Sequence, residues 1–334
     1  MITVKELAVL AETSVATVSR VLNGNPHVSE ATRKRVLEAI SATGYVPPKP
    51  SQQAEDEILV VLHTLNNPCF QDVLRGIEQK ASSCGFNTYF CVTHRNSKNE
   101  TRYLQSVLKK RTRGVIIISS SLSEPELDAF SMQVPTVLCC SAFNVTNASF
   151  VCIDDRQAAY DAIAYLNRIG NSKIAMLSYN QTNTPFVANR HAGYLQALKE
   201  FSLPYIPDYD LSCDNSYDDG YECAKHLFAL PDKPTAIFTF SEFTGIGVVD
   251  YLLEHGMTPG KDIDVLGFDG TSLSEHSNPK LSVMLQPAYN IGKISFEILL
   301  DQMTDPYNYV QRQIILSHKL ICRATTKPLS NNLT

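Results

Sequence analysis

The stretch TVKELAVLAETSVATVSRVLN, residues 3–23, contains two short amphipathic helices separated by a three-residue turn. Thr3 followed by Glu6 is a capping box, which predicts a helix from this point to about residue 10. Ser14 then caps a second helix over Val15–Leu22, and the Asn-Gly-Asn-Pro sequence that follows ends it. Two helices joined in this way predict a helix-turn-helix, whose second helix enters the major groove of DNA.

A third helix is predicted from its N-cap, Ser29, to Gly44. Its apolar residues Val36, Leu37 and Ile40 recur at helical spacing, as expected of a helix that packs on the first two.

The second helix carries the residues that we expect to contact DNA. Val18 and Val21 face inward in this pattern, which leaves the opposite face free for the groove. We expect Arg20 to bind guanine through two hydrogen bonds, since its guanidinium matches the O6 and N7 acceptors. We expect Val15 and Ala16 to pack on thymine methyl groups. We expect hydrogen bonds to phosphates from Thr17, Ser19 and Asn23. Without further information, the same pattern fits an ordinary three-helix domain equally well.

The composition indicates a globular protein of two or three domains. The chain has 334 residues and a net charge of −5, but residues 1–50 carry +2 and the remainder −7. A small basic head on an acidic body is typical of a DNA reader fused to a sensor. No apolar run is long enough for a membrane span or a signal peptide, and the nine cysteines are scattered. We therefore expect a cytoplasmic protein with reduced thiols, no metal site and no membrane contact.

Beyond residue 58 the pattern changes to short apolar strands that alternate with amphipathic helices. This alternation predicts parallel sheets covered by helices on both faces, and the number of strands predicts two lobes with a ligand cleft between them. The predicted strands are Ile58–Leu62, Asn87–Val92, Gly114–Ile118, Thr136–Cys139, Phe150–Ile153, Lys173–Leu177, Ala236–Thr239 and Asp264–Gly267. The predicted helices between them are 69–85, 99–110, 155–169, 187–200, 216–229 and 242–255.

The head also resembles a known family. TVKELA at 3–8, SVATVSRVLN at 14–23, Val28-Ser29 and Gly44-Tyr45 resemble the LacI/GalR family of transcriptional regulators in both residues and spacing. The resemblance implies a homodimer that binds double-stranded operator DNA and a two-lobed, periplasmic-binding-protein-like sensor. The family usually has Gly-Val before the capping serine, whereas this chain has Glu12 and Thr13. We expect Glu12 to lie in a turn where glycine is easier to accommodate.

The resemblance covers the rest of the chain and implies three domains. These are a helix-turn-helix head at 1–46, a linker at 47–57 and an effector-binding and dimerisation domain at 58–334. Lobe 1 is expected at about 58–155 and 287–314, and lobe 2 at about 156–286 and 315–334.

The linker departs from the family, which has a hinge helix that inserts a leucine into the minor groove. This chain instead has the proline-rich stretch PPKP at 47–50 and three acidic residues at 55–57. Proline removes helix donors and the acidic residues repel phosphate, so we expect a flexible tether and little bending of the operator.

The sensor carries family motifs at NPCF (67–70), RGIE (75–78), ID (153–154), RHAGY (190–194), PTAIF (234–238) and GFD (267–269). The resemblance makes Phe70 a stacking face and Arg190 and Asp269 a polar clamp for a small-molecule effector. An arginine fork and an aspartate can together hold a polar ring. Further effector-binding candidates are Asp154, Phe238 and Phe240. Phe238 lies within a strand and also fits a core position, and Arg190 also fits a surface ion pair.

Glu242 stands where the family usually has aspartate, and its extra methylene is expected to reshape the floor of the site.

Two C-terminal stretches, QPAYNIG at 286–292 and LLDQM at 299–303, are most similar to the nucleoside-responsive (cytidine) repressors of the family. That similarity favours a nucleoside effector and implies a neighbouring DNA-bound activator as a partner. A sugar-responsive paralogue fits as an alternative. An enzyme or a free small-molecule-binding protein of the same lobed fold is an alternative from another class. No dinucleotide fingerprint, P-loop or nucleophile motif is present, so we expect no catalysis and no cofactor. The effector, the direction of its effect and the operator sequence stay open.

Overall fold

The computed structural model describes residues 4–22, 28–43, 56–109, 112–180 and 184–328. By its internal contacts the chain divides into two compact units, Met1–Glu55 and Asp56–Thr334. We call the first unit the head and the second the sensor.

The head contains the helices α1 (Val4–Leu10), α2 (Val15–Leu22) and α3 (Glu30–Thr43). Their shared core is small and consists of Leu7, Ala8, Ala11, Val18, Val21 and Val36, all buried. Both predicted serine caps are confirmed, since the Oγ atoms of Ser14 and Ser29 accept the amides of Thr17 at 3.1 Å and Thr32 at 3.4 Å. Local capping therefore fixes where α2 and α3 begin.

The turn between α1 and α2 confirms the expectation for Glu12. Its φ angle is 47°, in the left-handed region that favours glycine. Its carboxylate lies 3.6 Å from Arg35 of α3, so the residue also links the turn to the third helix.

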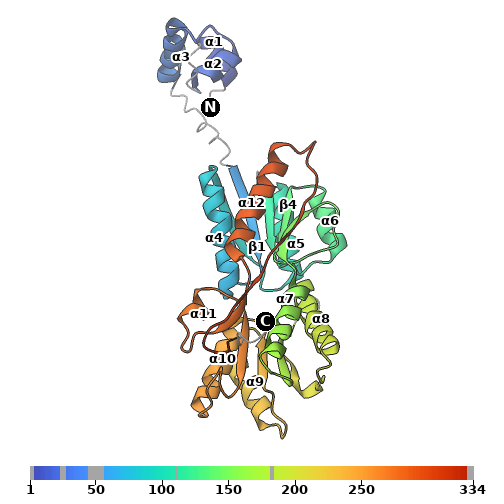
Figure 1. Cartoon of the computed structure of the whole chain (residues 1–334). Coiled ribbons are helices and arrows are strands. Elements are labelled where there is room, and N and C mark those ends of the chain that lie inside the picture. The colour runs from blue at the N-terminus through green and yellow to red at the C-terminus, as the bar shows by residue number, and fades with distance from the viewer. Residues whose placement is uncertain (1–3, 23–27, 44–55, 110–111, 181–183, 329–334) are drawn as a thin grey trace. The chain divides into compact units, whose positions relative to one another are not determined.

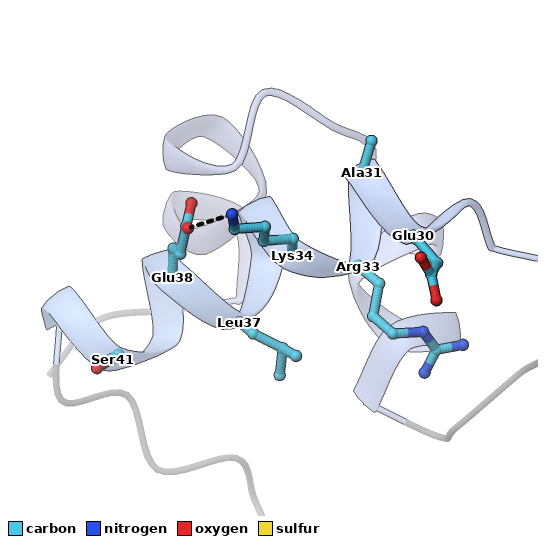
Figure 2. A pocket seen from close by; sticks show the side chains of 7 residues that line it. All are labelled: Glu30, Ala31, Arg33, Lys34, Leu37, Glu38 and Ser41. Carbon is cyan, nitrogen blue, oxygen red and sulfur yellow. Dashed lines mark ion pairs between the residues drawn. The ribbon is translucent and has the colours of Figure 1, made fainter.

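Leu37 does not lie in the core of the head. Its side chain is 52% exposed, whereas Val36 is fully buried. Adjacent helical residues point about 100° apart, so Val36 and Ile40 share the inner face and Leu37 cannot. Figure 2 shows Leu37 on the opposite face of α3 with Lys34, Glu38 and Arg33, around a hollow of about 700 Å³.

The sensor contains two six-stranded sheets (Figure 1). Sheet 1 has the order β11-β5-β4-β3-β1-β2 and is parallel throughout. Its strands are β1 (Asp56–Leu62), β2 (Phe86–Val92), β3 (Gly114–Ile118), β4 (Thr136–Cys139), β5 (Ser149–Ile153) and β11 (Gln313–Leu316). Sheet 2 has the order β12-β10-β9-β8-β6-β7, and within it only the pair β10–β12 is antiparallel. Its strands are β6 (Ile174–Tyr179), β7 (Asp210–Cys213), β8 (Ala236–Thr239), β9 (Asp264–Asp269), β10 (Ser282–Leu285) and β12 (Lys319–Ile321).

Helices cover both faces of each sheet, as the alternation predicted. On sheet 1, α4 (Pro68–Ser83) and α12 (Ala288–Thr304) cover one face, and α5 (Ser97–Lys109) and α6 (Glu124–Ser131) cover the other. On sheet 2, α7 (Asp155–Arg168) and α8 (Pro185–Glu200) lie opposite α9 (Tyr217–Ala229) and α10 (Glu242–Glu254). The short elements η1 (Pro207–Tyr209) and α11 (Ser272–His276) complete the described fold. The central strands are buried on both sides for this reason.

Helix α12 approaches α4 closely because both helices have a glycine at the contact. A Cβ atom on Gly76 would lie 2.1 Å from the carbonyl oxygen of Tyr289, and one on Gly292 would lie 1.9 Å from that of Val73. Real Cβ atoms do not come so near, so only glycine permits this spacing.

The eight predicted strands are all present, but four were missed: β7, β10, β11 and β12. Each has only three or four residues, and β7, β11 and β12 are partly exposed edge strands whose apolar pattern is short. The predicted linker also ends too late. Asp56 and Glu57 already belong to β1, where Asp56 pairs with Phe86 and its carboxylate lies 2.6 Å from Arg113. Residues 47–55 of that linker lie outside the described residues.

The chain passes between the two sheets after β5, after β10 and after β11. The last passage comes after Leu316 rather than after residue 314, because Leu316 is still paired with Ile153 of sheet 1.

Candidate effector site and DNA-reading face

In the described part of α2, Val15 is 44% exposed, Thr17 is half-buried, and Val18 and Val21 are buried, as predicted. Ala16, Ser19 and Arg20 also belong to α2, but their side chains lie outside the described part, as does all of Asn23. The helix therefore has an inward apolar side and an outward side that begins with Val15.

Strained backbone gathers at the carboxyl ends of the sensor's strands. His94 and Arg95 follow β2, Ser119 follows β3, Cys140 follows β4, and Asp269 ends β9; all five have positive φ angles, between 52° and 87°. Such conformations cost of order 1–3 kcal/mol each in non-glycine residues, and they cluster where function requires a fixed side-chain direction. The carboxyl ends of parallel strands are also where ligands bind in sheets of this class. The strain thus makes the space between the sheets the candidate functional site.

Arg190 is at the centre of this site. It lies on α8 and is only 3% exposed. Its Nε donates to Asp155 Oδ1 at 2.9 Å, and Nη1 donates to the carbonyl oxygen of Phe240 at 3.0 Å. Its guanidinium carbon lies 3.5 Å from the centre of the Phe268 ring. The guanidinium is therefore fixed by a carboxylate, a carbonyl and an aromatic face, the stacked arrangement that arginine favours over lysine.

Asp269 and Gln286 form the second polar group of the site. Gln286 Nε2 donates to Asp269 Oδ1 at 2.7 Å and approaches the sulfur of Cys69 at 3.1 Å. Asp269 is 6% exposed and has no ion-pair partner within 4.0 Å among the described residues. A carboxylate held in this way can accept hydrogen bonds from ligand hydroxyl groups.

Three buried carboxyl groups lie at the site or beside it, and the charge of Arg190 acts on two of them, Asp155 and Asp269. Burial raises the pKa of Asp155 to about 6, although Arg190 acts in the opposite direction. Burial and then the charge of Asp269 raise the pKa of Glu242 to about 7, while hydrogen bonds from Thr271 counteract both. Burial also raises the pKa of Asp269. With one guanidinium among three carboxyl groups, the site favours a ligand that donates hydrogen bonds.

Aromatic rings enclose the polar groups. Tyr179 stacks on Phe240 with ring centres 5.4 Å apart, and Phe186 lies 5.7 Å from the same ring. The cavity among these side chains has a volume of only about 10 Å³, barely the space that one water molecule needs. Its lining consists of Asn67, Phe70, Cys140, Phe186, Arg190, Phe240, Asp269 and Gln286. We call this group of residues the cage. A cavity of this volume does not hold a sugar or a nucleoside.

The structure brings four of the six predicted effector residues into the cage: Phe70, Arg190, Phe240 and Asp269. Asp154 is exposed, and its carboxylate caps α7 by accepting the amide of Gln157 at 2.9 Å. Phe238 is fully buried in β8, where its ring packs 6.3 Å from that of Phe268 beneath the site.

Sequence reasoning missed Asp155, Gln286 and Phe186. Asp155 is adjacent to the predicted Asp154, but only the fold shows which of the two carboxylates turns toward Arg190. Gln286 follows β10, a strand too short to be recognised. Phe186 lies one residue before the start of the helix predicted at 187 and is in the first turn of α8.

Glu242, predicted at the floor of the site, does not line the cage directly. It is 1% exposed at the start of α10 and accepts hydrogen bonds from the amide of Thr271 at 2.9 Å and from the Thr271 hydroxyl. It therefore holds the loop that follows Asp269.

Among the described residues, no helix is both long and apolar enough to cross a membrane. The same residues contain no group of three or more histidine, cysteine, aspartate or glutamate side chains arranged to hold a metal ion.

Comparison with known proteins gives the same two units. The family model "bacterial regulatory proteins, lacI family" matches residues 3–48, and the model "periplasmic binding proteins and sugar binding domain of LacI family" matches residues 55–322. Catabolite control protein A of Priestia megaterium is 32% identical over 98% of this chain and 99% of its own length. The transcriptional repressor CytR of Escherichia coli is 28% identical over 98% of this chain and 97% of its own. The solved complex of the transcriptional regulator CelR with cellobiose is 26% identical, with a TM-score of 0.71 over 97% of this chain and 100% of that one.

Proposed function

This chain belongs to the LacI family of DNA-binding transcriptional regulators, and we propose that a polar small molecule bound in the cage controls its operator binding. The observation that carries the proposal is the buried constellation of Arg190, Asp155, Asp269 and Gln286 between the two sheets. Members of this family are regulators and not enzymes. A buried guanidinium and carboxylate surrounded by aromatic rings are suited to binding rather than to bond cleavage.

We propose that α2 is the recognition helix. Arg20 would read guanine, Val15 and Ala16 would contact thymine methyl groups, and Thr17, Ser19 and Asn23 would hold phosphates. The exposure of Val15 and the burial of Val18 support this orientation. The linker is proposed to be a tether that bends the operator little, and a circular-permutation gel that shows a sharp kink would refute that proposal.

The effector we favour is a nucleoside. Phe70, Phe186 and Phe240 offer ring faces for a base, while Arg190 and Asp269 match the hydroxyl groups of a ribose. Because the cage is nearly closed, ligand entry requires the sheets to separate, and ligand contacts to both sheets would then close them again. We propose that movement of one sheet relative to the other transmits effector binding to the DNA-binding heads. A typical coupling of about 1–3 kcal/mol changes operator affinity by about 5- to 150-fold.

The test is selection of bound DNA from a random library, with and without cytidine, adenosine, ribose and cellobiose. We expect one palindromic sequence to be enriched and one class of compound to change its recovery. An Arg190→Gln variant should enrich the same sequence but lose the response, whereas the exposed Arg156→Gln variant should retain both. Enrichment of no sequence would refute the regulator, and a response that survives in Arg190→Gln would refute the cage. A response to the sugars alone would make the effector a sugar.

We also propose that the protein acts as a homodimer in the cytoplasm. Supporting this, Tyr89 and Phe90 on β2, one of the two edge strands of sheet 1, are 52% and 50% exposed. Large exposed apolar residues on an edge strand favour association with a second copy. Sedimentation should show a dimer for the natural chain and a weakened dimer for Phe90→Asp, with Asn87→Asp as the control on the same strand. A neighbouring DNA-bound activator stays a prediction from the family resemblance.

A further inference from the structure

A second cavity, separate from the cage, lies where loops of both sheets meet. Its volume is about 350 Å³, large enough for a phosphorylated ligand group. Sheet 1 contributes Arg95 and the loop of Ser120, Ser121 and Ser123, and sheet 2 contributes Thr184 and Pro185 at the start of α8. We call this space the outer chamber. None of the residues predicted to bind effector lines it.

Arg95 gives the outer chamber a positive charge that no carboxylate neutralises at short range. Its guanidinium lies 4.4 Å from the centre of the Tyr179 ring, and Nη2 lies 2.9 Å from His63 Nε2. Burial, and then the charge of Arg95, lower the pKa of His63 to about 3, so this partner is neutral at pH 7. Burial lowers the pKa of Arg95, and Tyr179 and Asp214 act in the opposite direction. Asp214 is exposed, and no described carboxylate oxygen lies within 4.0 Å of the guanidinium.

The backbone that positions Arg95 is strained. His94 and Arg95 are consecutive residues with φ angles of 52° and 58°. A partly buried cation without a counter-charge loses hydration and favours an anion as its partner. Strain and desolvation at one residue together indicate a binding role for it.

The other walls of the outer chamber suit an anion as well. The Ser120 hydroxyl and the Ser121 amide both donate to the buried Glu100, which fixes the serine loop in place. Thr184 is the N-cap of the 16-residue helix α8, but its hydroxyl makes no capping hydrogen bond. The first residue of α8, Pro185, has no amide hydrogen, so the Thr184 hydroxyl is the donor at this helix end that suits a phosphate oxygen, and the positive end of the helix dipole favours an anion. One carboxylate, Glu124, also lines the chamber, and it accepts the amide of Asn144 at 2.7 Å.

We propose that the outer chamber binds the phosphate monoester of an effector whose polar ring occupies the cage. This inference rests on the proposed function, because the two spaces adjoin: Pro185 lines the outer chamber, and Phe186, the next residue, lines the cage. Tyr179 packs against both Arg95 and Phe240, and the Arg190 guanidinium lies 4.8 Å from the centre of the Phe240 ring. The effector class is therefore a sugar phosphate or a nucleoside monophosphate, with Arg95 as the residue that distinguishes it from the unphosphorylated compound.

The test is calorimetric titration of the full chain with matched pairs: cytidine and cytidine 5′-monophosphate, and ribose and ribose 5-phosphate. Inorganic phosphate is added as a separate probe in a thermal-shift assay at constant ionic strength. We expect the phosphorylated member of one pair to bind about 10- to 100-fold more tightly than its partner, the usual range for charge-assisted hydrogen bonds. Arg95→Gln should abolish this difference and leave the unphosphorylated compound unaffected. Arg102→Gln, which removes an exposed charge from the neighbouring helix α5, should behave like the natural chain.

Three results would overturn the proposal: equal affinity within both pairs, a preference that survives in Arg95→Gln, or no binding of any phosphorylated compound and no thermal shift with phosphate. If the proposed function is wrong, the outcome is different: no operator DNA is enriched, or the response to the effector does not depend on Arg190. The two failures are therefore distinguishable.

Discussion

Glu242 offers a direct test of how the sensor's stability depends on pH. The carboxyl group is buried, its hydrogen bonds come from Thr271, and burial and the charge of Asp269 raise its pKa from 4.5 to about 7. Between pH 4.5 and 7 the folded chain holds a proton that the unfolded chain has released. The free energy of unfolding therefore falls as pH rises through this window, and it stays low above pH 7. A shift of about 2.5 units at about 1.36 kcal/mol per unit gives a penalty of about 3 kcal/mol at pH 8.

The perturbation is Glu242→Gln, which keeps the shape of the side chain and one acceptor for the Thr271 amide but never ionises. We expect the variant to match the natural chain near pH 4.5 and to exceed its free energy of unfolding by up to about 3 kcal/mol at pH 8. Part of the decrease in the free energy of unfolding between pH 4 and 6 should remain in the variant, because burial also raises the pKa of Asp155, to about 6.

Urea unfolding at pH 5, 6, 7 and 8, followed by tyrosine fluorescence, measures this difference. Every tyrosine except Tyr45 lies in the sensor, so the signal reports that unit. Glu222→Gln is the matched control, since it removes an exposed carboxylate paired with Lys225 on α9 and should leave the pH profile unchanged. Parallel profiles for Glu242→Gln and the natural chain, or a variant less stable at pH 8, would refute the reasoning.

Four further substitutions test the site, the packing and the head. Arg190→Lys keeps the charge but loses the planar guanidinium that stacks on Phe268, so effector affinity in calorimetry should fall at least tenfold. Arg190→Ala leaves Asp155 buried without its partner and should lower the free energy of urea unfolding by about 3–5 kcal/mol. Gly292→Ala places a methyl group against the carbonyl of Val73 and should lower the thermal midpoint by several degrees, at a cost of about 1–3 kcal/mol; an unchanged midpoint would show that α12 shifts freely. Arg20→Ala should relax the preference at one base pair of each half-site by about 1–3 kcal/mol in DNA selection, and an unaltered selected sequence would contradict its role.

The sequence determined the three helices of the head and the fold class of the sensor by local pattern, and the helix-turn-helix by its family resemblance. Helix caps and a 3.6-residue apolar period act between residues a few positions apart, so Ser14 and Ser29 could be assigned before the fold was known, while the turn at Glu12 was implied by the family resemblance. The long apolar strands were equally clear, because a strand buried on both faces is apolar throughout. Family motifs then supplied Phe70, Arg190 and Asp269.

The tertiary structure decided which of the candidate side chains meet. It turns Asp155 rather than Asp154 toward Arg190, buries Phe238 beneath the cage, and brings Gln286 to Asp269 from a strand too short to recognise. These outcomes depend on contacts between segments far apart in the chain, which no local pattern records. The raised pKa values of Asp155 and Glu242 have the same origin, because burial and neighbouring charges exist only after both sheets have formed.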